Sequence, residues 1–150
     1  MRFFATVVSV VVAASCAVFV HAAPLQTRQI GNLQCNIARL QIVTDLSKTS
    51  DAVKQLSTQV TGTDADSVAT AQAGISGAQT AIGGIAKALF TGQAASADLR
   101  DQVAGNLTSA TTALNSISST DPTTSSTLSN AISLLGDSTS AGEQVVAQCK

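Results

Sequence analysis

The sequence has almost no aromatic side chains and a single histidine. Its 150 residues include four Phe, no Trp and no Tyr, and 11% of them are charged. The histidine, His21, precedes the point at which we expect the chain to be cleaved, so the mature chain would contain none. A serine nucleophile needs a base to take its proton, and histidine is the usual base. We therefore expect a protein that is not an enzyme, with a core made of aliphatic side chains.

The first 22 residues have the pattern of a secretory signal peptide. Arg2 precedes an apolar run that extends to Val20, and Val20 and Ala22 occupy the −3 and −1 positions of a cleavage site. We expect cleavage after Ala22 and secretion of one domain, residues 23–150. Polar residues interrupt the apolar run, which argues against a transmembrane anchor. The expected location is extracellular, with the cell wall as an alternative.

Cysteine is also scarce, because removal of the first 22 residues leaves only Cys35 and Cys149. Two cysteines in an oxidising compartment pair by default, so we expect a disulfide between them. Closing a loop of this length contributes about 4 to 5 kcal/mol in the chain-entropy model. Two free thiols or a metal-binding pair are the competing interpretations, and both are weak without histidine.

The few charges are balanced and dispersed. The chain has eight Lys and Arg against nine Asp and Glu, a formal net charge of −1. Without a basic cluster, no nucleic-acid-binding surface is predicted. No phosphate-binding glycine loop or metal-ligand spacing is present, so no cofactor is expected.

Apolar residues recur at steps of three and four, the pattern of amphipathic helices. The first stripe comprises Leu33, Ile37, Leu40, Val43, Leu46, Val53, Leu56 and Val60. The second comprises Val68, Ala71, Ile75, Ala78, Ile82, Ile85 and Leu89. The third comprises Leu99, Val103, Leu107, Ala110, Leu114 and Ile117. The fourth comprises Leu128, Ala131, Ile132, Leu135, Val145, Val146 and Cys149.

Polar turns separate the four stripes. The residues expected to cap helix starts are Asp64 or Asp66 for the second helix, Ser96 or Asp98 for the third and Asp121 for the fourth. Pro122 directly after Asp121 is a specific start signal. Four segments of roughly 24 to 28 residues joined by short turns predict an all-α, up-down four-helix bundle. A short fifth helix around residues 25–31 is an alternative that the sequence does not decide.

The predicted topology agrees with the predicted disulfide. Up-down winding brings the start of the first helix and the end of the fourth to the same pole, where Cys35 and Cys149 have to meet. Small residues are frequent in the second segment between Ala71 and Gly84. They either allow close helix packing or leave a groove that a long apolar molecule fills, and periodicity alone favours close packing.

Three groups of residues resemble catalytic or metal sites, and each has a simpler explanation. Residues 136–138, Gly-Asp-Ser, resemble the nucleophile block of one lipase and esterase class, but without a base we interpret them as a helix irregularity. Residues 64–66 begin like a calcium loop whose later ligands are missing, so we interpret them as a helix cap. Asp98 and Asp101, three residues apart in a first turn, are better explained as solvated helix-start residues than as an acid–base pair.

Two kinds of glycosylation signal are present. Asn106-Leu107-Thr108 is the sole N-glycosylation sequon, and its place within a predicted helix works against modification. Ser and Thr are concentrated around residues 120–126, where we expect O-glycosylation in a secreted chain.

Four short motifs follow one another along the domain. They are CNIARLQIV at residues 35–43, GQA at 92–94, RDQV at 100–103 and GEQVVAQC at 142–149. In order and spacing they resemble the fungal hydrophobic surface-binding protein A family, which includes the cell-wall galactomannoproteins. The resemblance implies a small secreted helical protein that adsorbs to hydrophobic surfaces and helps to recruit hydrolases, such as a secreted esterase or cutinase. It also implies binding of fatty acids or other lipids, as related wall mannoproteins do in a helical cavity.

Two mechanisms would give such binding. A closed bundle holds an acyl chain between its stripes, or the bundle opens on an apolar surface at a hinge in residues 91–95. The residues that we expect to contact the ligand or surface are Val43, Leu46, Ile75, Ile82, Ile85, Leu89, Phe90, Leu107, Leu114 and Leu135. The alternative function is a structural or antigenic wall mannoprotein, or a secreted effector, without a ligand.

Overall fold

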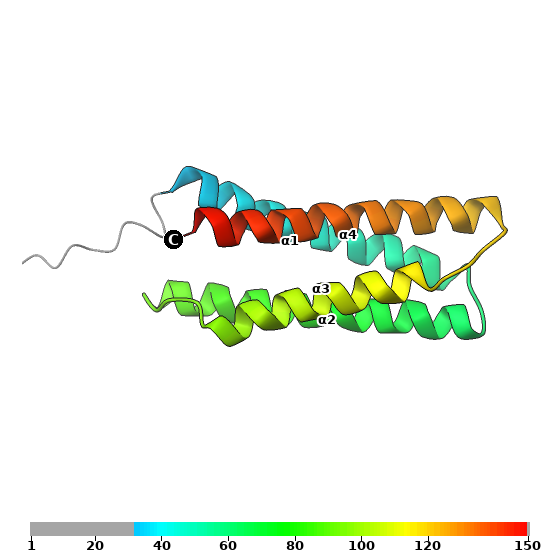
Figure 1. Ribbon diagram of the computed structural model, residues 1–150, viewed down its shortest axis with the longest axis horizontal. Coiled ribbons are helices and arrows are strands. Elements are labelled where there is room, and N and C mark those ends of the chain that lie inside the picture. Colours follow the sequence, from blue (N-terminus) through cyan, green and yellow to red (C-terminus); the bar gives the residue numbers. More distant parts are fainter. Residues whose placement is uncertain (1–31, 150) are drawn as a thin grey trace, which may run out of the picture.

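The computed structural model describes residues 32–149, which form an all-α four-helix bundle (Figure 1). The helices are α1 (Leu33–Ser57), α2 (Thr63–Phe90), α3 (Ala97–Asn115) and α4 (Pro122–Gln148). They run up and down in turn, as the stripes predict. The expected signal peptide, the cleavage after Ala22 and the fifth helix around residues 25–31 lie outside the described residues.

Polar side chains satisfy the free backbone N–H groups at three of the helix starts. Asn32 accepts hydrogen bonds from the first turn of α1, and Ser96 accepts one from Leu99 N. Asp121 accepts one from Thr124 N at 2.7 Å, with Pro122 in the first turn behind it. The predicted caps Ser96 and Asp121 are therefore confirmed.

The start of α2 differs from the prediction. Its N-cap is Gly62, with φ +64°, and no side chain caps it. Asp64 and Asp66 lie inside the first turn instead, where their carboxylates oppose the positive end of the helix dipole. The prediction that one of them is the cap was wrong, because the glycine lets the helix begin two residues earlier than it would behind a capping Asp64.

Helix α4 is continuous through residues 136–138. Ser138 is fully buried and donates a hydrogen bond to Leu134 O at 2.9 Å, one helical turn earlier. The interpretation of this segment as a helix irregularity was therefore wrong. Neither Gly136 nor Gly142 breaks the helix, because helical backbone bonds continue on both sides of them.

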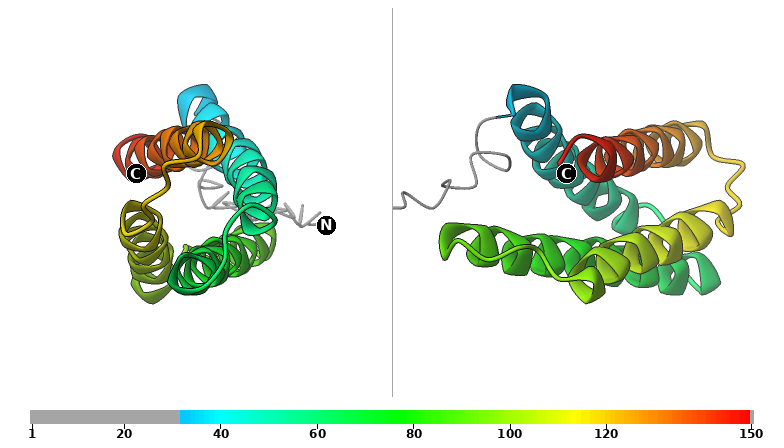
Figure 2. Two further views of the ribbon diagram at one scale, coloured as in Figure 1. Left: turned by 90° about the vertical axis from the view of Figure 1, so that its right-hand side faces the viewer. Right: turned by 60° about the vertical axis from the view of Figure 1, so that its left-hand side comes forward.

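The four helices pack as two antiparallel pairs. Contacts are extensive between α1 and α4 and between α2 and α3, and they are much sparser between the pairs. Figure 2 shows the two pairs diverging from the pole that carries residues 58–62 and 116–121 toward the pole that carries the chain's C-terminal end. We call the first pole the closed pole and the second the open end.

The α1–α4 pair is fastened at the open end. Cys35 and Cys149 form the predicted disulfide, with their Cα atoms 5.1 Å apart. Asn32 Nδ2 also donates a hydrogen bond to Gln148 O at 2.9 Å. The disulfide and this bond together hold the first turn of α1 against the last turn of α4.

The α2–α3 pair is held by close backbone approach. A Cβ atom placed on Gly74 would lie 2.7 Å from the backbone oxygen of Asn106, and one on Gly77 would lie 2.5 Å from Asn106 Oδ1. Only glycine fits at position 74, where the facing atom belongs to the backbone, and a Cβ at position 77 would require the Asn106 side chain to move. At these two positions the small residues of α2 close the interface, as periodicity favoured, and leave no room for a ligand between α2 and α3.

The core is aliphatic and rich in alanine. Its largest fully buried hydrophobic side chains are Leu46, Val53, Leu56, Val68, Ile75, Leu114 and Leu135. Alanines complete it on all four helices. Such a core buries less apolar area per residue than one built on aromatic side chains, so close helix contact and the disulfide matter more here.

One predicted stripe has the wrong register. Leu33, Ile37, Leu40 and Val43 are exposed, and the buried face of this part of α1 is formed by Cys35, Ala38 and Ile42. Counted through Ser50, which occupies one position of the register, the stripe from residue 33 to 60 advances by about 3.4 residues per step, against 3.6 per helical turn. The stripe therefore turns by roughly half the circumference between its ends. Its second half faces the core and its first half faces away.

Candidate hydrophobic binding site

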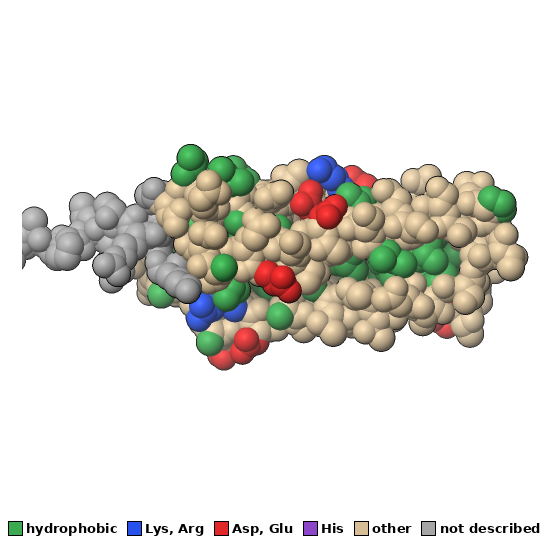
Figure 3. Space-filling view, turned by 45° about the horizontal axis from the view of Figure 1, so that its top comes forward, with side chains coloured by type: hydrophobic (Ala, Val, Ile, Leu, Met, Phe, Trp, Pro, Cys, Tyr) green, Lys and Arg blue, Asp and Glu red, His purple; other side chains and the backbone are tan. Residues whose placement is uncertain are grey.

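A groove lies between α3 and α4, where the two helix pairs meet only loosely. Its volume is about 340 Å³. The lining residues are Thr111, Ile132, Leu135, Gly136, Thr139, Ser140 and Glu143. Figure 3 shows hydrophobic side chains exposed in a band along the long axis of the molecule. The volume falls in the lower part of the range of about 300 to 1,000 Å³ that is usual for small-molecule sites.

The polar groups of the groove are mostly engaged within the helices. Thr111 donates to Leu107 O and Thr139 donates to Leu135 O, each at 2.9 Å. Both hydroxyls are therefore engaged with the backbone, and Ile132 contributes apolar surface to the lining. The exposed carboxylate of Glu143 stands at one end of the groove. The groove combines an apolar middle with one charged group at its edge.

The divergence of the two pairs leaves apolar side chains half-buried near the open end. On α2, the core-facing side chains are buried as far along the helix as Ala81. Beyond that residue, Ile82, Ile85 and Leu89 keep part of their surface exposed. Leu99 at the start of α3 is also half-buried. Each of these side chains leaves apolar surface exposed near the open end.

The ten predicted contact residues separate into three groups. Five belong to the closed core: Leu46, Ile75, Leu107, Leu114 and Leu135. Three are half-buried near the open end: Ile82, Ile85 and Leu89. Two are exposed: Val43 on the outer side of α1 and Phe90 at the end of α2. The structure brings Leu135 to the groove and does not gather all ten around one cavity.

Several exposed apolar residues were missed or misplaced by the sequence interpretation. Ile132 and Gly136 line the groove, but the sequence does not show which side of α4 faces the gap. The outward position of Leu33, Ile37 and Leu40 could have been found from the short spacing of their stripe. A second spacing on the same segment, Cys35, Ala38 and Ile42, marks the true inner face.

The expected hinge in residues 91–95 lies within the more tightly packed α2–α3 pair. The sparse contacts are instead those between the pairs, which are joined by residues 58–62 and 116–121. The packing of α1 on α4 and of α2 on α3 therefore favours a hinge in these two connecting segments, and the hinge in residues 91–95 stays an untested prediction. Separation of the pairs would keep the disulfide intact and bend only the two connecting segments.

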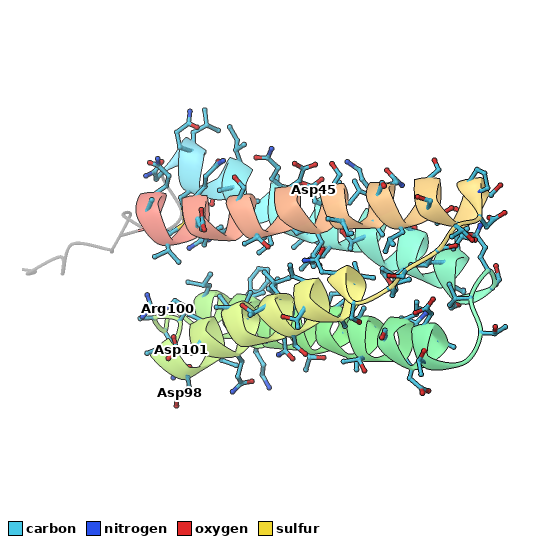
Figure 4. The ribbon with its side chains drawn as sticks, turned by 45° about the vertical axis from the view of Figure 1, so that its right-hand side comes forward. Asp45, Asp98, Arg100 and Asp101 are labelled. Carbon is cyan, nitrogen blue, oxygen red and sulfur yellow. A yellow bond between two sulfur atoms is a disulfide. The ribbon has the colours of Figure 1, made fainter. Side chains whose placement is uncertain are left out.

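The acidic residues considered for catalysis are solvated. Asp98, Arg100 and Asp101 are exposed and lie together at the start of α3 (Figure 4). Asp45 lies on α1, away from them, and its carboxylate pairs with Lys48 Nζ at 3.2 Å. The interpretation of Asp98 and Asp101 as helix-start residues agrees with these positions.

The carboxylate of Asp121 caps the start of α4 and has a displaced pKa. The pKa is lowered from its ordinary value, first because Thr124 N–H donates to the carboxylate and then because the Thr124 hydroxyl does so at 2.9 Å. Hydrogen bonds to the charged form favour that form. The shift reflects helix capping at the closed pole.

Ser138 and Thr49 form a buried polar contact between α1 and α4. Their hydroxyl oxygens are 3.4 Å apart, and each hydroxyl donates to the carbonyl four residues earlier in its own helix. The serine of the esterase-like segment is thus enclosed between two helices, and its proton is already donated. Its position fits a packing role.

The side chain of Asn106 lies at the α2–α3 interface. Nδ2 donates to Gln102 O at 2.8 Å, and the amide lies against Gly77. A glycan on Nδ2 would require the amide to leave this contact. These contacts argue against N-glycosylation of Asn106 in the folded protein.

The fold and these surfaces define an all-α, disulfide-linked helical bundle with an apolar groove. None of the helices within residues 32–149 is long and apolar enough to cross a membrane. Comparison of the chain with protein-family models, with curated proteins and with solved structures finds no match.

Proposed function

We propose that this is a secreted, non-enzymatic protein that binds acyl chains of lipids and adsorbs to hydrophobic surfaces through its amphipathic helices. The observation that carries the proposal is the groove between α3 and α4, whose middle is apolar and whose volume is about 340 Å³. Half-buried apolar side chains on α2 extend the available surface toward the open end. The resemblance to the hydrophobic surface-binding family adds recruitment of a secreted esterase or cutinase-type hydrolase to such a surface, and a place in the cell wall.

The packing of the pairs supports binding by partial opening. Contacts within each pair are extensive, and those between the pairs are sparse. Separation of the pairs therefore costs fewer core contacts than separation within a pair, and an acyl chain in the gap would replace them with contacts of the same kind. An alanine-rich core lowers the cost further, because little apolar area is lost.

The alternative, a structural protein without a ligand, rests on the close approach of Gly74 to Asn106. At that interface the small residues serve packing alone. The same explanation does not cover the groove, where a Cβ placed on Gly136 would have no heavy atom within 4 Å.

The test fills the groove from Gly136. Gly136→Leu adds an apolar side chain that reaches into open space, and Gly105→Leu on the exposed side of α3 is the matched control, since a Cβ there also meets nothing within 4 Å. We expect wild type and Gly105→Leu to bind a fluorescent long-chain fatty acid and to carry acyl lipid after purification. Gly136→Leu should bind the probe at least about tenfold more weakly. The proposal would be contradicted if the wild type carried no acyl lipid after purification and did not bind the probe.

A further inference from the structure

Within residues 32–149, the outer side of α1 carries an apolar row that is not covered by another helix. Leu33, Ile37 and Leu40, spaced by four and three residues, are 69%, 45% and 70% exposed. Val43 flanks the row and is 52% exposed. We call Leu33, Ile37, Leu40 and Val43 the outer stripe. An i, i+4, i+7 spacing places side chains on one line along a helix, so the first three form a continuous ridge.

The disulfide fixes the direction of the outer stripe. Cys35 is fully buried and bonded to Cys149 of α4. Leu33 precedes Cys35 by two residues, which is about 200° around an α-helix. Because Cys35 must face α4, Leu33 has to face away from the bundle. The exposed ridge is thus a fixed feature of the closed structure.

The outer stripe lies in a segment that is nearly free of charge. Among residues 33–44 the only charged side chain is Arg39, which is half-buried. The exposed side chains that alternate with the stripe are uncharged, and they are Gln34, Gln41 and Thr44. Binding to an anionic bilayer relies on Lys and Arg beside the apolar face, and this segment offers no cluster of them. An uncharged apolar surface complements the stripe best.

The area of the stripe argues against a second copy of the chain as its occupant. Four partly exposed aliphatic side chains present on the order of 400 Å², whereas a stable interface needs about 800 Å² from each partner. An extended surface has no such limit, because neighbouring exposed apolar residues can join the contact. Val146 near the end of α4 and Phe90 at the end of α2 are exposed at the same end of the molecule. In Figure 3 hydrophobic side chains protrude at this end.

We infer that the outer stripe is the docking site for an extended, uncharged apolar surface such as solid hydrocarbon or wax, and that it adsorbs with the bundle closed. This inference rests on the proposed function and assigns surface adsorption to residues outside the groove. The stripe lies on α1 and the groove lies between α3 and α4, so adsorption through the stripe leaves the groove available to an acyl chain.

The test distinguishes adsorption through the outer stripe from fatty-acid binding in the groove. A variant with Leu33→Gln, Ile37→Gln and Leu40→Gln removes the ridge without touching the core. A control with Thr44→Gln and Ser47→Gln changes exposed polar residues of the same helix. Adsorption to octadecyl-coated silica and to paraffin is measured by depletion from solution, with fatty-acid binding and helix content measured on the same samples.

We expect the stripe variant to adsorb about tenfold or more weakly than wild type and the control, while its fatty-acid binding and helix content are unchanged. Adsorption of the wild type should be insensitive to salt. In a second measurement, with phosphatidylcholine vesicles, its binding should not depend on added phosphatidylserine. Equal adsorption of wild type and stripe variant overturns the inference and leaves the proposed function standing. Adsorption that requires phosphatidylserine and is lost in salt, or a dimer that the stripe variant dissociates, also overturns it. Wild type that neither adsorbs nor binds fatty acid overturns the proposed function.

Discussion

Gly77 of α2 lies against the side chain of Asn106 of α3, so closely that a Cβ on Gly77 would be 2.5 Å from Asn106 Oδ1. One turn earlier, a Cβ on Gly74 would be 2.7 Å from the backbone oxygen of the same asparagine. Asn106 thus contacts two glycines of the facing helix, with its side chain and with its backbone. The two contacts differ in what can move, because an amide side chain can rotate and a helix backbone cannot.

This difference predicts a ranking of glycine substitutions in α2. Gly74→Ala should destabilise the protein by about 1 to 3 kcal/mol, since α3 must shift to admit the methyl group. Gly77→Ala should cost less, because the end of the Asn106 side chain can give way. Gly83→Ala, where a Cβ meets nothing within 4 Å, should stabilise by up to about 1 kcal/mol through helix propensity. Urea denaturation checks the order, and equal effects at all three positions would contradict the close packing.

The same contact bears on N-glycosylation. Asn106 Nδ2 donates to Gln102 O and its amide faces Gly77, so a glycan there would separate α2 from α3. We expect the folded protein to carry no glycan at Asn106. Intact-mass measurement before and after treatment with an N-glycosidase checks this, with Asn106→Gln as the reference. A mass shift in folded protein would show that the α2–α3 interface tolerates the glycan.

Loss of the disulfide should weaken the α1–α4 pair at the open end. The bond closes a loop with a sequence separation of 114, and its removal should cost about 4 kcal/mol. The double variant Cys35→Ala, Cys149→Ala avoids a free thiol. We expect a lower urea midpoint, whereas adsorption to apolar surfaces should change little, because the outer stripe adsorbs with the bundle closed. Much faster adsorption without the bond would count against adsorption by the closed bundle.

The capping carboxylate of Asp121 predicts a pH dependence. Its pKa is lowered in the folded state by hydrogen bonds from Thr124 N–H and the Thr124 hydroxyl. A carboxyl group with a lowered folded pKa stabilises the protein above its unfolded pKa, and this contribution is lost as the pH falls through the folded pKa. Asp121→Asn keeps a capping oxygen and removes the charge. We expect its stability to fall less than that of wild type between about pH 4 and pH 2, measured by thermal unfolding.

The helix content and the disulfide could be predicted because both depend on local signals. Stripe spacing, the Ser96 cap and the Asp121-Pro122 start are read from neighbouring residues. Two cysteines in a chain that is expected to be secreted leave one disulfide to form. Up-down winding then follows from the short turns between the helices.

The pairing of the helices and the exposed surfaces could not be predicted in the same way. Pairing depends on which helix faces approach most closely. The close approach at Gly74 becomes evident only when the structure places Asn106 opposite it. The groove depends on a gap between α3 and α4, and no residue type in the sequence indicates such a gap. The outer stripe was predicted as core because its spacing fits a helix face over any short window, and the drift shows only over many turns.

Loose packing near the open end predicts unequal costs for the same substitution at two positions of α3. Leu114 is fully buried near the closed pole, and Leu99 is half-buried near the open end against Gly84 of α2. Leu114→Ala should cost about 3 to 5 kcal/mol, because it leaves a cavity in the core. Leu99→Ala should cost about 1 to 2 kcal/mol, because part of its surface is already in water. Urea denaturation measures both, and equal costs would mean that the pairs are packed as tightly at the open end as at the closed pole.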